Sequence, residues 1–219
     1  MTHELRLAVV EDQPLYRQML AGLLNTQSGM RVVAEAAGAA EARRRIKPGG
    51  ADVALLDVEL PDGNGVGLGV ALRRADPHIG IVLLSSQDVM ELLLDLPEDV
   101  RRGWSYLSKS SATSVETLLQ AIRATARGEV VLDPTLVEAA TVRAGSALAS
   151  LSARQYEVLT LVARGLSNQG VAEQLGLSAR SVENHLGAIY AALDLPPAHN
   201  SRVAAVLRLI EDTARGTAR

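Results

Sequence analysis

The sequence contains no cysteine and no phenylalanine, and only one of its 219 residues is tryptophan. The absence of cysteine excludes disulfide bonds, thiol catalysis and zinc sites built on sulfur. The absence of phenylalanine means that aliphatic side chains must fill any core. Hydrophobic residues nevertheless make up 47 % of the chain, which excludes a disordered protein.

Long apolar segments are missing as well. The sequence has no run of about 18 apolar residues, the length that a membrane-spanning helix needs. Its first ten residues, MTHELRLAVV, are too short and too charged for a signal peptide. We therefore expect a cytoplasmic protein with no membrane partner.

The chain has no excess of positive charge: it holds 22 basic and 25 acidic side chains, and its net charge is −3. Residues 1–150 hold 15 basic and 19 acidic side chains, whereas residues 151–219 hold 7 basic and 6 acidic ones. The second part is only slightly basic. Any binding to nucleic acid must therefore depend on a few placed contacts and not on a large positive field.

Short apolar runs alternate with helical patterns over the first 125 or so residues. The runs predict strands at 5–10, 31–36, 52–58, 79–84 and 104–107, and the patterns between and after them predict helices at 14–26, 39–46, 65–74, 88–96 and 114–126. On the first helix we expect one apolar face made by Leu15, Met19, Leu20, Leu23 and Leu24. This order predicts an α/β fold with a five-stranded, doubly wound parallel sheet, whose site lies at the C-terminal ends of the strands.

The character of the sequence changes after this α/β pattern. We predict a first domain over residues 1–127, a partly helical linker over 128–148, and a separate all-α domain over 149–219. In the last part, Ser167 and Ser178 each follow a Gly-Leu pair and are placed to cap a helix. Two short helices joined by a glycine-containing turn are typical of a helix-turn-helix.

Charged and hydroxyl side chains follow the predicted strands where each one ends. Glu11 and Asp12 follow the first strand, Asp57 closes the third, Ser85 follows the fourth and Lys109 follows the fifth. Clustered carboxylates favour a hard divalent cation, so the pattern predicts a Mg²⁺ site. Asp57 could then attack a phosphoryl group, whose charge Lys109 and Ser85 would meet. Taken alone, Asp12 is also a good helix cap, and a lone lysine after a strand is usually a solvated surface residue.

The first 126 residues resemble a receiver domain, which has a flavodoxin-like fold, and the whole chain resembles the NarL/FixJ (LuxR-type) class of two-component response regulators. The resemblance rests on DVELPDGNG at 57–65, the acidic pair, the hydroxyl after the fourth strand and YLSK at 106–109. It implies that a metal is held by Glu11, Asp12, Asp57 and the backbone carbonyl of Glu59, that Lys109 pairs with the phosphoryl group, and that Ser85 and Tyr106 form a switch.

The chain departs from the receiver pattern in three places. Glu11 replaces the commoner aspartate, and Glu59 is acidic where many receivers are neutral. We expect Glu59, two residues after the nucleophile, to alter the lifetime of the phosphoryl group, because its side chain would lie beside the incoming water. Residues 86–103 lack the usual approach to the fifth strand, and Pro97 should end the preceding helix early.

The stretch GLSNQGVAEQLGLSARSVENHL at 165–186 closely resembles the LuxR-type DNA-binding module. We expect Val182, Leu186, Ile189, Tyr190 and Leu193 to form the core face of the recognition helix. The resemblance implies DNA contacts through Ser167, Asn168, Arg180, Ser181, Asn184, His185 and Ala188, although His185 is as well placed to pack against the core. Gln169 and Gly170 stand where basic and acidic residues are common in the family, and Glu183 and Ala192 stand where a basic residue is frequent.

The last predicted helix, 200–212, carries an apolar stripe made by Val203, Val206, Leu207 and Ile210. Ordinary core packing explains part of this stripe, and the seam of a homodimer explains the rest. A homodimer would also compensate for weak binding by one module, because two half-sites multiply the interaction.

Together these features predict a DNA-binding response regulator that a sensor histidine kinase phosphorylates on Asp57. We expect no enzyme activity apart from autocatalysed phosphoryl transfer to Asp57 and hydrolysis from it. One alternative is a regulator of the same fold that works without phosphorylation. Another is an aspartyl-phosphate phosphotransferase or phosphatase, for which Glu59 is an imperfect acid/base. A quorum-sensing LuxR protein would need an aromatic-lined pocket, which a first domain without phenylalanine disfavours.

Overall fold

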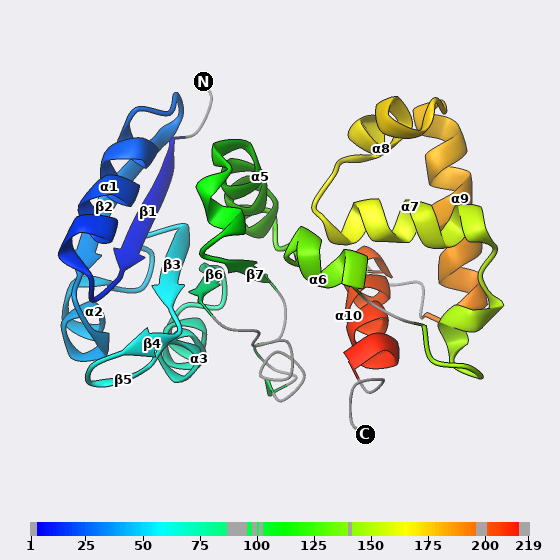
Figure 1. Ribbon diagram of the computed structural model, residues 1–219. Helices are drawn as coiled ribbons and strands as arrows, with labels where there is room; N and C mark the ends of the chain where they lie inside the picture. The colour runs from blue at the N-terminus through cyan, green and yellow to red at the C-terminus, as the bar shows by residue number, and fades with distance from the viewer. Residues whose placement is uncertain are drawn as a thin grey trace. The chain divides into compact units, whose positions relative to one another are not determined.

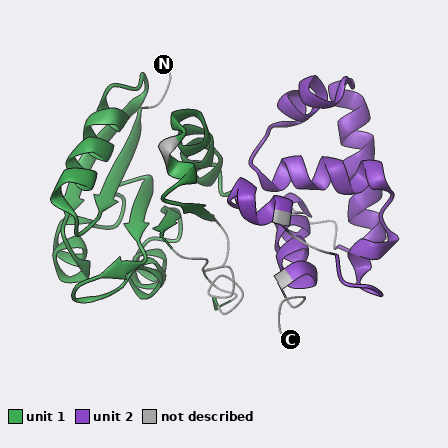
Figure 2. Cartoon of the chain, in the orientation of Figure 1, with its two compact units in different colours: residues 1–128 green, residues 129–219 purple. Residues whose placement is uncertain are grey.

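The computed structural model in Figure 1 describes residues 4–86, 96–97, 100, 103–139, 142–195 and 201–214. The chain divides into two compact units, residues 1–128 and residues 129–219, which Figure 2 distinguishes by colour. Over the described residues, no helix is both long enough and apolar enough to cross a membrane.

The first unit is built on a five-stranded sheet in the order β2-β1-β3-β6-β7, with every neighbouring pair parallel. The strands are β1 (Leu5–Val10), β2 (Met30–Ala36), β3 (Val53–Asp57), β6 (Gly80–Ser85) and β7 (Trp104–Ser108). All residues of β3 and β6 are buried, as expected for strands covered on both faces. The predicted doubly wound α/β fold is confirmed.

Four helices of the described chain connect or follow these strands. They are α1 (Pro14–Asn25), α2 (Ala39–Arg45), α3 (Gly65–Ala75) and α5 (Val115–Ala126). Helices α2 and α3 contact each other on one face of the sheet, whereas α1 packs on β1 and β2 and α5 on β3, β6 and β7. The helix predicted at 88–96 lies almost wholly outside the described residues.

The predicted apolar face of α1 is wrong at two positions. Leu15 is 81 % exposed and Met19 is 57 % exposed, while Leu20, Ala21 and Leu24 are buried. At 3.6 residues per turn, positions 15 and 19 lie nearly opposite positions 20 and 24. A single helix face therefore cannot include all of the leucines that the sequence offers.

A short hairpin that the sequence did not predict connects β3 to α3. It consists of β4 (Glu59–Leu60) and β5 (Gly63–Asn64), which pair antiparallel. Asn64 then caps α3, because its side-chain oxygen accepts a hydrogen bond from the backbone N–H of Val66 at 2.7 Å. The hairpin turns the chain immediately after Asp57, at the edge of the sheet where the site lies.

The second unit is helical: α6 (Pro134–Ala139), α7 (Ala153–Ala163), α8 (Asn168–Leu175), α9 (Ala179–Ala192), α10 (Ser201–Ala214) and the short 3₁₀ turn η2 (Ala147–Ser150). Helices α8 and α9 form the predicted helix-turn-helix. Gly176 ends α8 with φ of +64°, a backbone conformation that favours glycine, and Ser178 caps α9. On α9, Val182, Leu186, Ile189 and Leu193 are buried and Tyr190 is half-buried.

Much of the segment predicted as a linker packs inside this second unit. Val130, Val131 and Leu132 are buried, and the backbone N–H of Leu132 donates to the carbonyl of Ala163 at the end of α7, at 2.8 Å. Asp133 starts α6, since its backbone carbonyl accepts hydrogen bonds from Leu136 and Val137. These residues belong to the second compact unit, which begins at residue 129.

Candidate functional site

Three carboxylates meet at the C-terminal edge of the sheet. Glu11 and Asp12 follow β1, and Asp57 ends the neighbouring strand β3. Ligand oxygens of all three lie within 4.8 Å of one another, although Glu11 is only 1 % exposed and Asp57 only 3 %. The structure thus brings together the acidic residues that the sequence singled out.

Lys109 reaches into this cluster from the residue after β7. Its Nζ lies 2.9 Å from Asp57 Oδ2 and 2.9 Å from Glu11 Oε2, so that one ammonium bridges two carboxylates. Burial alone would lower the pKa of Lys109, but hydrogen bonds to Asp57 and Glu11 outweigh it and raise that pKa. Lys109 is therefore a charged member of the site and not a solvated surface residue.

Glu11 has an environment that favours a bound cation. Burial raises its pKa, the hydrogen bond from Lys109 opposes that rise, and the charge of Asp57 adds to it. Glu11 Oε2 is buried and forms an ion pair with Lys109 Nζ at 2.9 Å, while Glu11 Oε1 accepts a hydrogen bond from the same nitrogen at 3.1 Å. Buried carboxylate oxygens are hard ligands of the kind that Mg²⁺ prefers. The cluster therefore fits a divalent metal ion.

The backbone around Asp57 is fixed by close packing. Asp57 Oδ1 accepts a hydrogen bond from the Glu59 N–H at 3.1 Å, while the Glu59 residue itself is exposed. A Cβ at Gly65 would lie 2.0 Å from the Asp57 carbonyl oxygen, so only glycine fits there. Gly65, which closes the motif at 57–65, thus lets the start of helix α3 lie directly against the Asp57 backbone.

Asp62, in the turn of the hairpin, has a role that sequence reasoning missed. Its carboxylate accepts hydrogen bonds from the backbone N–H groups of Ala39 and Ala40, at 2.6 and 2.8 Å, and so caps α2. These two bonds, that of Ala40 first, lower the pKa of Asp62. Asp62 is 23 and 22 positions away from Ala39 and Ala40 in the sequence, so no local sequence pattern could predict this cap.

Ser85 and Tyr106 lie on neighbouring strands, β6 and β7, and each is 1 % exposed. Ser85 ends β6 beside β3, which places it at the same edge as Asp57. The backbone N–H of Lys109 donates to the carbonyl of Ser85 at 2.7 Å. Tyr106 lies on β7, three residues before Lys109, and is part of the buried core.

Tyr16 is a further neighbour of the site that the sequence did not reveal. The Nζ of Lys109 lies 5.2 Å from the centroid of its ring, within the range of a cation–π interaction. Burial raises the pKa of Tyr16. Arg17, the next residue, donates to the backbone carbonyl of Glu11 at 2.5 Å. Asp12, by contrast, does not cap α1, whose N-cap residue is Gln13.

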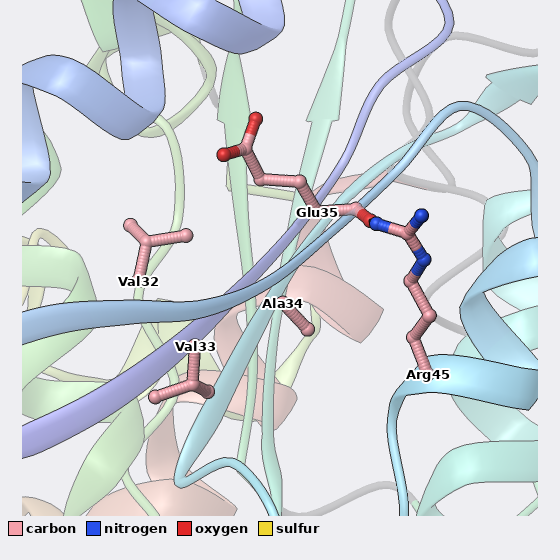
Figure 3. A pocket seen from close by; sticks show the side chains of 5 residues that line it. All are labelled: Val32, Val33, Ala34, Glu35 and Arg45. Carbon is pink, nitrogen blue, oxygen red and sulfur yellow. The ribbon is translucent and has the colours of Figure 1, made fainter.

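A hollow of about 420 Å³ lies elsewhere, along the edge strand β2, and is shown in Figure 3. Val32, Val33, Ala34, Glu35 and Arg45 line it. Arg45 donates to the backbone carbonyl of Glu35 at 2.8 Å, and Asn25 accepts from the N–H of Val32 at 2.8 Å. The side chains of Arg45 and Asn25 thus form hydrogen bonds with backbone groups of the edge strand β2. Backbone groups that are already bonded in this way are not available to pair with a strand of another chain.

The predicted DNA-contact residues of the helix-turn-helix differ in exposure and in hydrogen bonding. Arg180, Asn184 and Ala188 are exposed on α9, and Arg180 lies 3.6 Å from Glu183. Ser167 and Ser181 take part in caps: Ser167 accepts from the N–H of Gly170, and Ser181 donates its N–H to Ser178. His185 is half-buried, and Asn168 accepts a hydrogen bond from Arg202.

The apolar stripe of α10 lies mostly in the core of its own unit, which is one of the two explanations that its pattern left open. Val203, Val206 and Ile210 are at most 4 % exposed, because α10 packs against α7 and α9. Only Leu207 is partly exposed. Three of the four residues predicted for a dimer seam therefore belong to the core of the second unit.

These features define a class of protein: a parallel α/β domain with a strand-end aspartate, two further acids and a lysine, followed by a helix-turn-helix. Comparison with known families agrees. Residues 7–123 match the family described as the response regulator receiver domain, and residues 149–209 match the family described as bacterial regulatory proteins, luxR family. The chain belongs to the NarL/FixJ family and is a DNA-binding two-component response regulator.

Individual relatives cover nearly the whole chain. The uncharacterized transcriptional regulatory protein YxjL of Bacillus subtilis is 32 % identical and aligns over 84 % of this chain and 86 % of its own length. The oxygen regulatory protein NreC of Staphylococcus haemolyticus is 29 % identical over 87 % of this chain and 92 % of its own. The crystal structure of ChrA, a response regulator of a heme-sensing two-component system, has a TM-score of 0.50 and 26 % identity, covering 96 % of this chain and 98 % of that one.

Proposed function

We propose that Asp57 is the phosphoacceptor of this response regulator, that a sensor histidine kinase is its donor, and that phosphorylation controls binding to DNA. The observation that carries the proposal is the Lys109 ammonium, 2.9 Å from both the Asp57 and the Glu11 carboxylates in a buried cluster. A lysine held there meets the negative charge of an incoming phosphoryl group at the nucleophile itself.

In the proposed reaction, an Asp57 carboxylate oxygen attacks the phosphorus of a phosphohistidine or of acetyl phosphate. A P–O bond to Asp57 forms as the bond from phosphorus to the donor breaks, and the donor leaves with that electron pair. Lys109 and the Ser85 hydroxyl stabilise the phosphoryl oxygens, and the Glu59 N–H keeps Asp57 oriented. Hydrolysis of the acyl phosphate by water later restores Asp57.

Mg²⁺ is the proposed cofactor, with Glu11, Asp12, Asp57 and the backbone carbonyl of Glu59 as its ligands. When bound, it supplies positive charge that neutralises the acidic cluster and the phosphoryl oxygens. The ligand oxygens of Glu11, Asp12 and Asp57, all within 4.8 Å of one another, support this assignment. Lys109 alone provides one positive charge against three carboxylates.

Two further roles belong to the same proposal. Ser85 and Tyr106 report the phosphoryl group, which the burial of both side chains on adjacent strands supports. Glu59, exposed two residues after the nucleophile, sets how long the phosphoryl group survives. An unchanged dephosphorylation rate in Glu59→Asn would remove that role.

The proposed DNA-binding face consists of Ser167, Asn168, Arg180, Ser181, Asn184, His185 and Ala188. The exposure of Arg180, Asn184 and Ala188 on one helix of a helix-turn-helix supports it. We also propose a homodimer, for which Leu207 is the one stripe residue that is not buried. Beyond the phosphoryl chemistry of Asp57, we propose no enzymatic activity.

The direct test is phosphorylation with acetyl phosphate, followed by intact mass measurement. The full chain should gain one acid-labile phosphoryl group in the presence of Mg²⁺ and none in its absence, and Asp57→Asn should gain none. A phosphoryl group on Asp57→Asn would place the chemistry elsewhere. Failure of the wild-type chain to accept phosphate from acetyl phosphate and from a cognate kinase would favour a regulator that works without phosphorylation.

A further inference from the structure

Arg202, in the first turn of α10, connects three elements of the DNA-binding unit. Its Nη1 donates to Asn168 Oδ1 at 3.0 Å, and its Nη2 donates to the backbone carbonyl of Leu166 in the turn before α8. The guanidinium therefore joins α10 to the turn before α8 and to Asn168, the first residue of α8.

The bond to Asn168 fixes which end of its amide faces outward. A guanidinium has donors only, so the atom of Asn168 that faces Arg202 must be the oxygen. The two hydrogens of Asn168 Nδ2 then point away from Arg202, and no described residue accepts from them. Asn168 is partly exposed at the start of α8, so these donors are available to a ligand that is an acceptor.

DNA phosphates are acceptors without donors, and most protein–DNA hydrogen bonds go to phosphate or sugar. The neighbouring Ser167 hydroxyl already serves the cap of α8, where it accepts from the N–H of Gly170 at 3.1 Å. An asparagine with the opposite amide orientation would present its carbonyl oxygen to the phosphate and repel it. The orientation of this amide therefore decides whether Asn168 offers a donor or an acceptor to a DNA phosphate.

We propose that Arg202 is a positioning residue for DNA binding, which holds the Asn168 amide with Nδ2 outward to donate to a DNA phosphate and holds the turn through Leu166. The inference rests on the proposed DNA-binding face, of which Asn168 is a member. Arg202 itself does not touch DNA in this account, because its two outer nitrogens are engaged within the protein. The planar guanidinium of Arg202 directs two N–H donors at two separate acceptors, Asn168 Oδ1 and the Leu166 carbonyl. A lysine ammonium would match these two acceptors less well.

The experiment is a double-mutant cycle on DNA affinity with the full chain. The probe is the tightest-binding duplex that the wild-type protein selects from random sequence, and the variants are Arg202→Gln, Asn168→Ala and the double variant. Loss of one phosphate contact should weaken binding about fivefold to tenfold in each single variant. The double variant should be no weaker than the single ones, because both remove the same contact.

Arg208→Gln is the matched control. It removes one positive charge from the same helix, and the arginine lies six residues, or about 9 Å, further along its axis. It pairs with Glu211 and Asp212 and not with the turn. We expect its DNA affinity to stay within about twofold of wild type.

Several results would overturn the inference. Additive losses, or full affinity in Arg202→Gln with weakened binding in Asn168→Ala, would show that the two residues act independently, while leaving the DNA-binding face intact. A salt slope reduced by about one in Arg202→Gln but not in Asn168→Ala would mean that Arg202 contacts a phosphate itself. Unchanged affinity in Asn168→Ala would remove Asn168 from the face, and Asn184→Ala would then test the face separately.

The double-mutant cycle can be interpreted only if Arg202→Gln folds. Far-UV circular dichroism checks the folding of this variant. If it does not fold, Asn168→Asp provides the test. This variant keeps an oxygen for Arg202 but has no donor to present, so it should fold and lose at least tenfold in affinity. A folded Asn168→Asp variant with wild-type affinity would overturn the proposal.

Discussion

Glu11, directly after β1, and Asp57, at the end of the neighbouring parallel strand β3, share the ammonium of Lys109, which lies 2.9 Å from an oxygen of each. Both carboxylates are almost completely buried. Two buried negative charges repel each other, so the site requires a cation whether or not it carries a metal. Lys109 therefore has a structural task as well as the proposed one in phosphoryl transfer.

The first prediction concerns Lys109→Gln. Removing the cation leaves the two carboxylates without compensation, so the free energy of unfolding should fall by roughly 3 kcal/mol in metal-free buffer. Mg²⁺ should restore much of this loss, because it supplies the missing charge. Urea unfolding followed by the fluorescence of Trp104, the single tryptophan and a buried residue of the first unit, gives the measurement. Equal stability of the variant with and without Mg²⁺ would contradict the metal assignment.

The second prediction concerns pH. Burial raises the pKa of Glu11 above its ordinary value of 4.5. Between 4.5 and the raised value the native protein binds more protons than the unfolded chain, so the contribution of Glu11 to stability is largest at low pH and falls as pH rises through this window. Metal must displace the same proton, so the affinity for Mg²⁺ should increase with pH across it.

Glu11→Gln provides the control for this prediction. In metal-free buffer its stability should fall less steeply with rising pH than that of the wild type over the same window, because the titrating group is gone. Calorimetric titration of Mg²⁺ into the wild-type chain at a series of pH values checks the predicted increase of Mg²⁺ affinity with pH. Affinity for Mg²⁺ that does not change with pH would show that Glu11 is not a ligand that loses a proton.

The third prediction compares two glycines of α3. A Cβ at Gly65 would lie 2.0 Å from the Asp57 carbonyl oxygen and 2.8 Å from its carbon, and backbone atoms cannot yield as a flexible side chain can. Gly65→Ala should therefore displace Asp57, cost roughly 3 kcal/mol and slow phosphorylation strongly. Gly67→Ala, where nothing lies within 4 Å, should gain up to about 1 kcal/mol from helix propensity and phosphorylate normally. Similar behaviour of the two variants in urea and phosphorylation assays would contradict the packing account.

The fourth prediction separates the core of α10 from its surface. Val206 is 1 % exposed, so Val206→Ala should lower the free energy of unfolding of the second unit by about 1 to 2 kcal/mol. Leu207→Ser, at a partly exposed position, should cost less and should weaken self-association if Leu207 lies at the dimer seam. Thermal unfolding and analytical ultracentrifugation distinguish the two effects. Unaltered self-association in Leu207→Ser would remove this residue from the proposed seam.

The sequence predicted the sheet and the acidic site well, for a physical reason. Continuous apolar runs such as 52–58 have to be buried on both faces, and parallel strands bring their C-terminal ends to one edge. Glu11, Asp57 and Lys109 could be placed together from strand order alone, although they are far apart in the sequence.

Features that depend on tertiary contacts could not be predicted in this way. Leu15 and Met19 look like core residues, but helix geometry directs them away from the sheet. Asp62 caps a helix more than twenty residues earlier, and Arg202 bonds to Asn168 across 34 positions. The stripe of α10 shows the same limit, since a helix that packs in a core and a helix at a dimer seam have the same periodicity.

The most direct test of the account is the DNA affinity of the full chain before and after phosphorylation with acetyl phosphate and Mg²⁺, measured on the selected duplex with wild type and Asp57→Asn. Phosphorylation should increase the affinity of the wild-type chain at least tenfold, or by about 1.4 kcal/mol, and should leave Asp57→Asn unchanged. Equal affinity of the phosphorylated and unphosphorylated wild-type protein would contradict the claim that Asp57 controls binding to DNA.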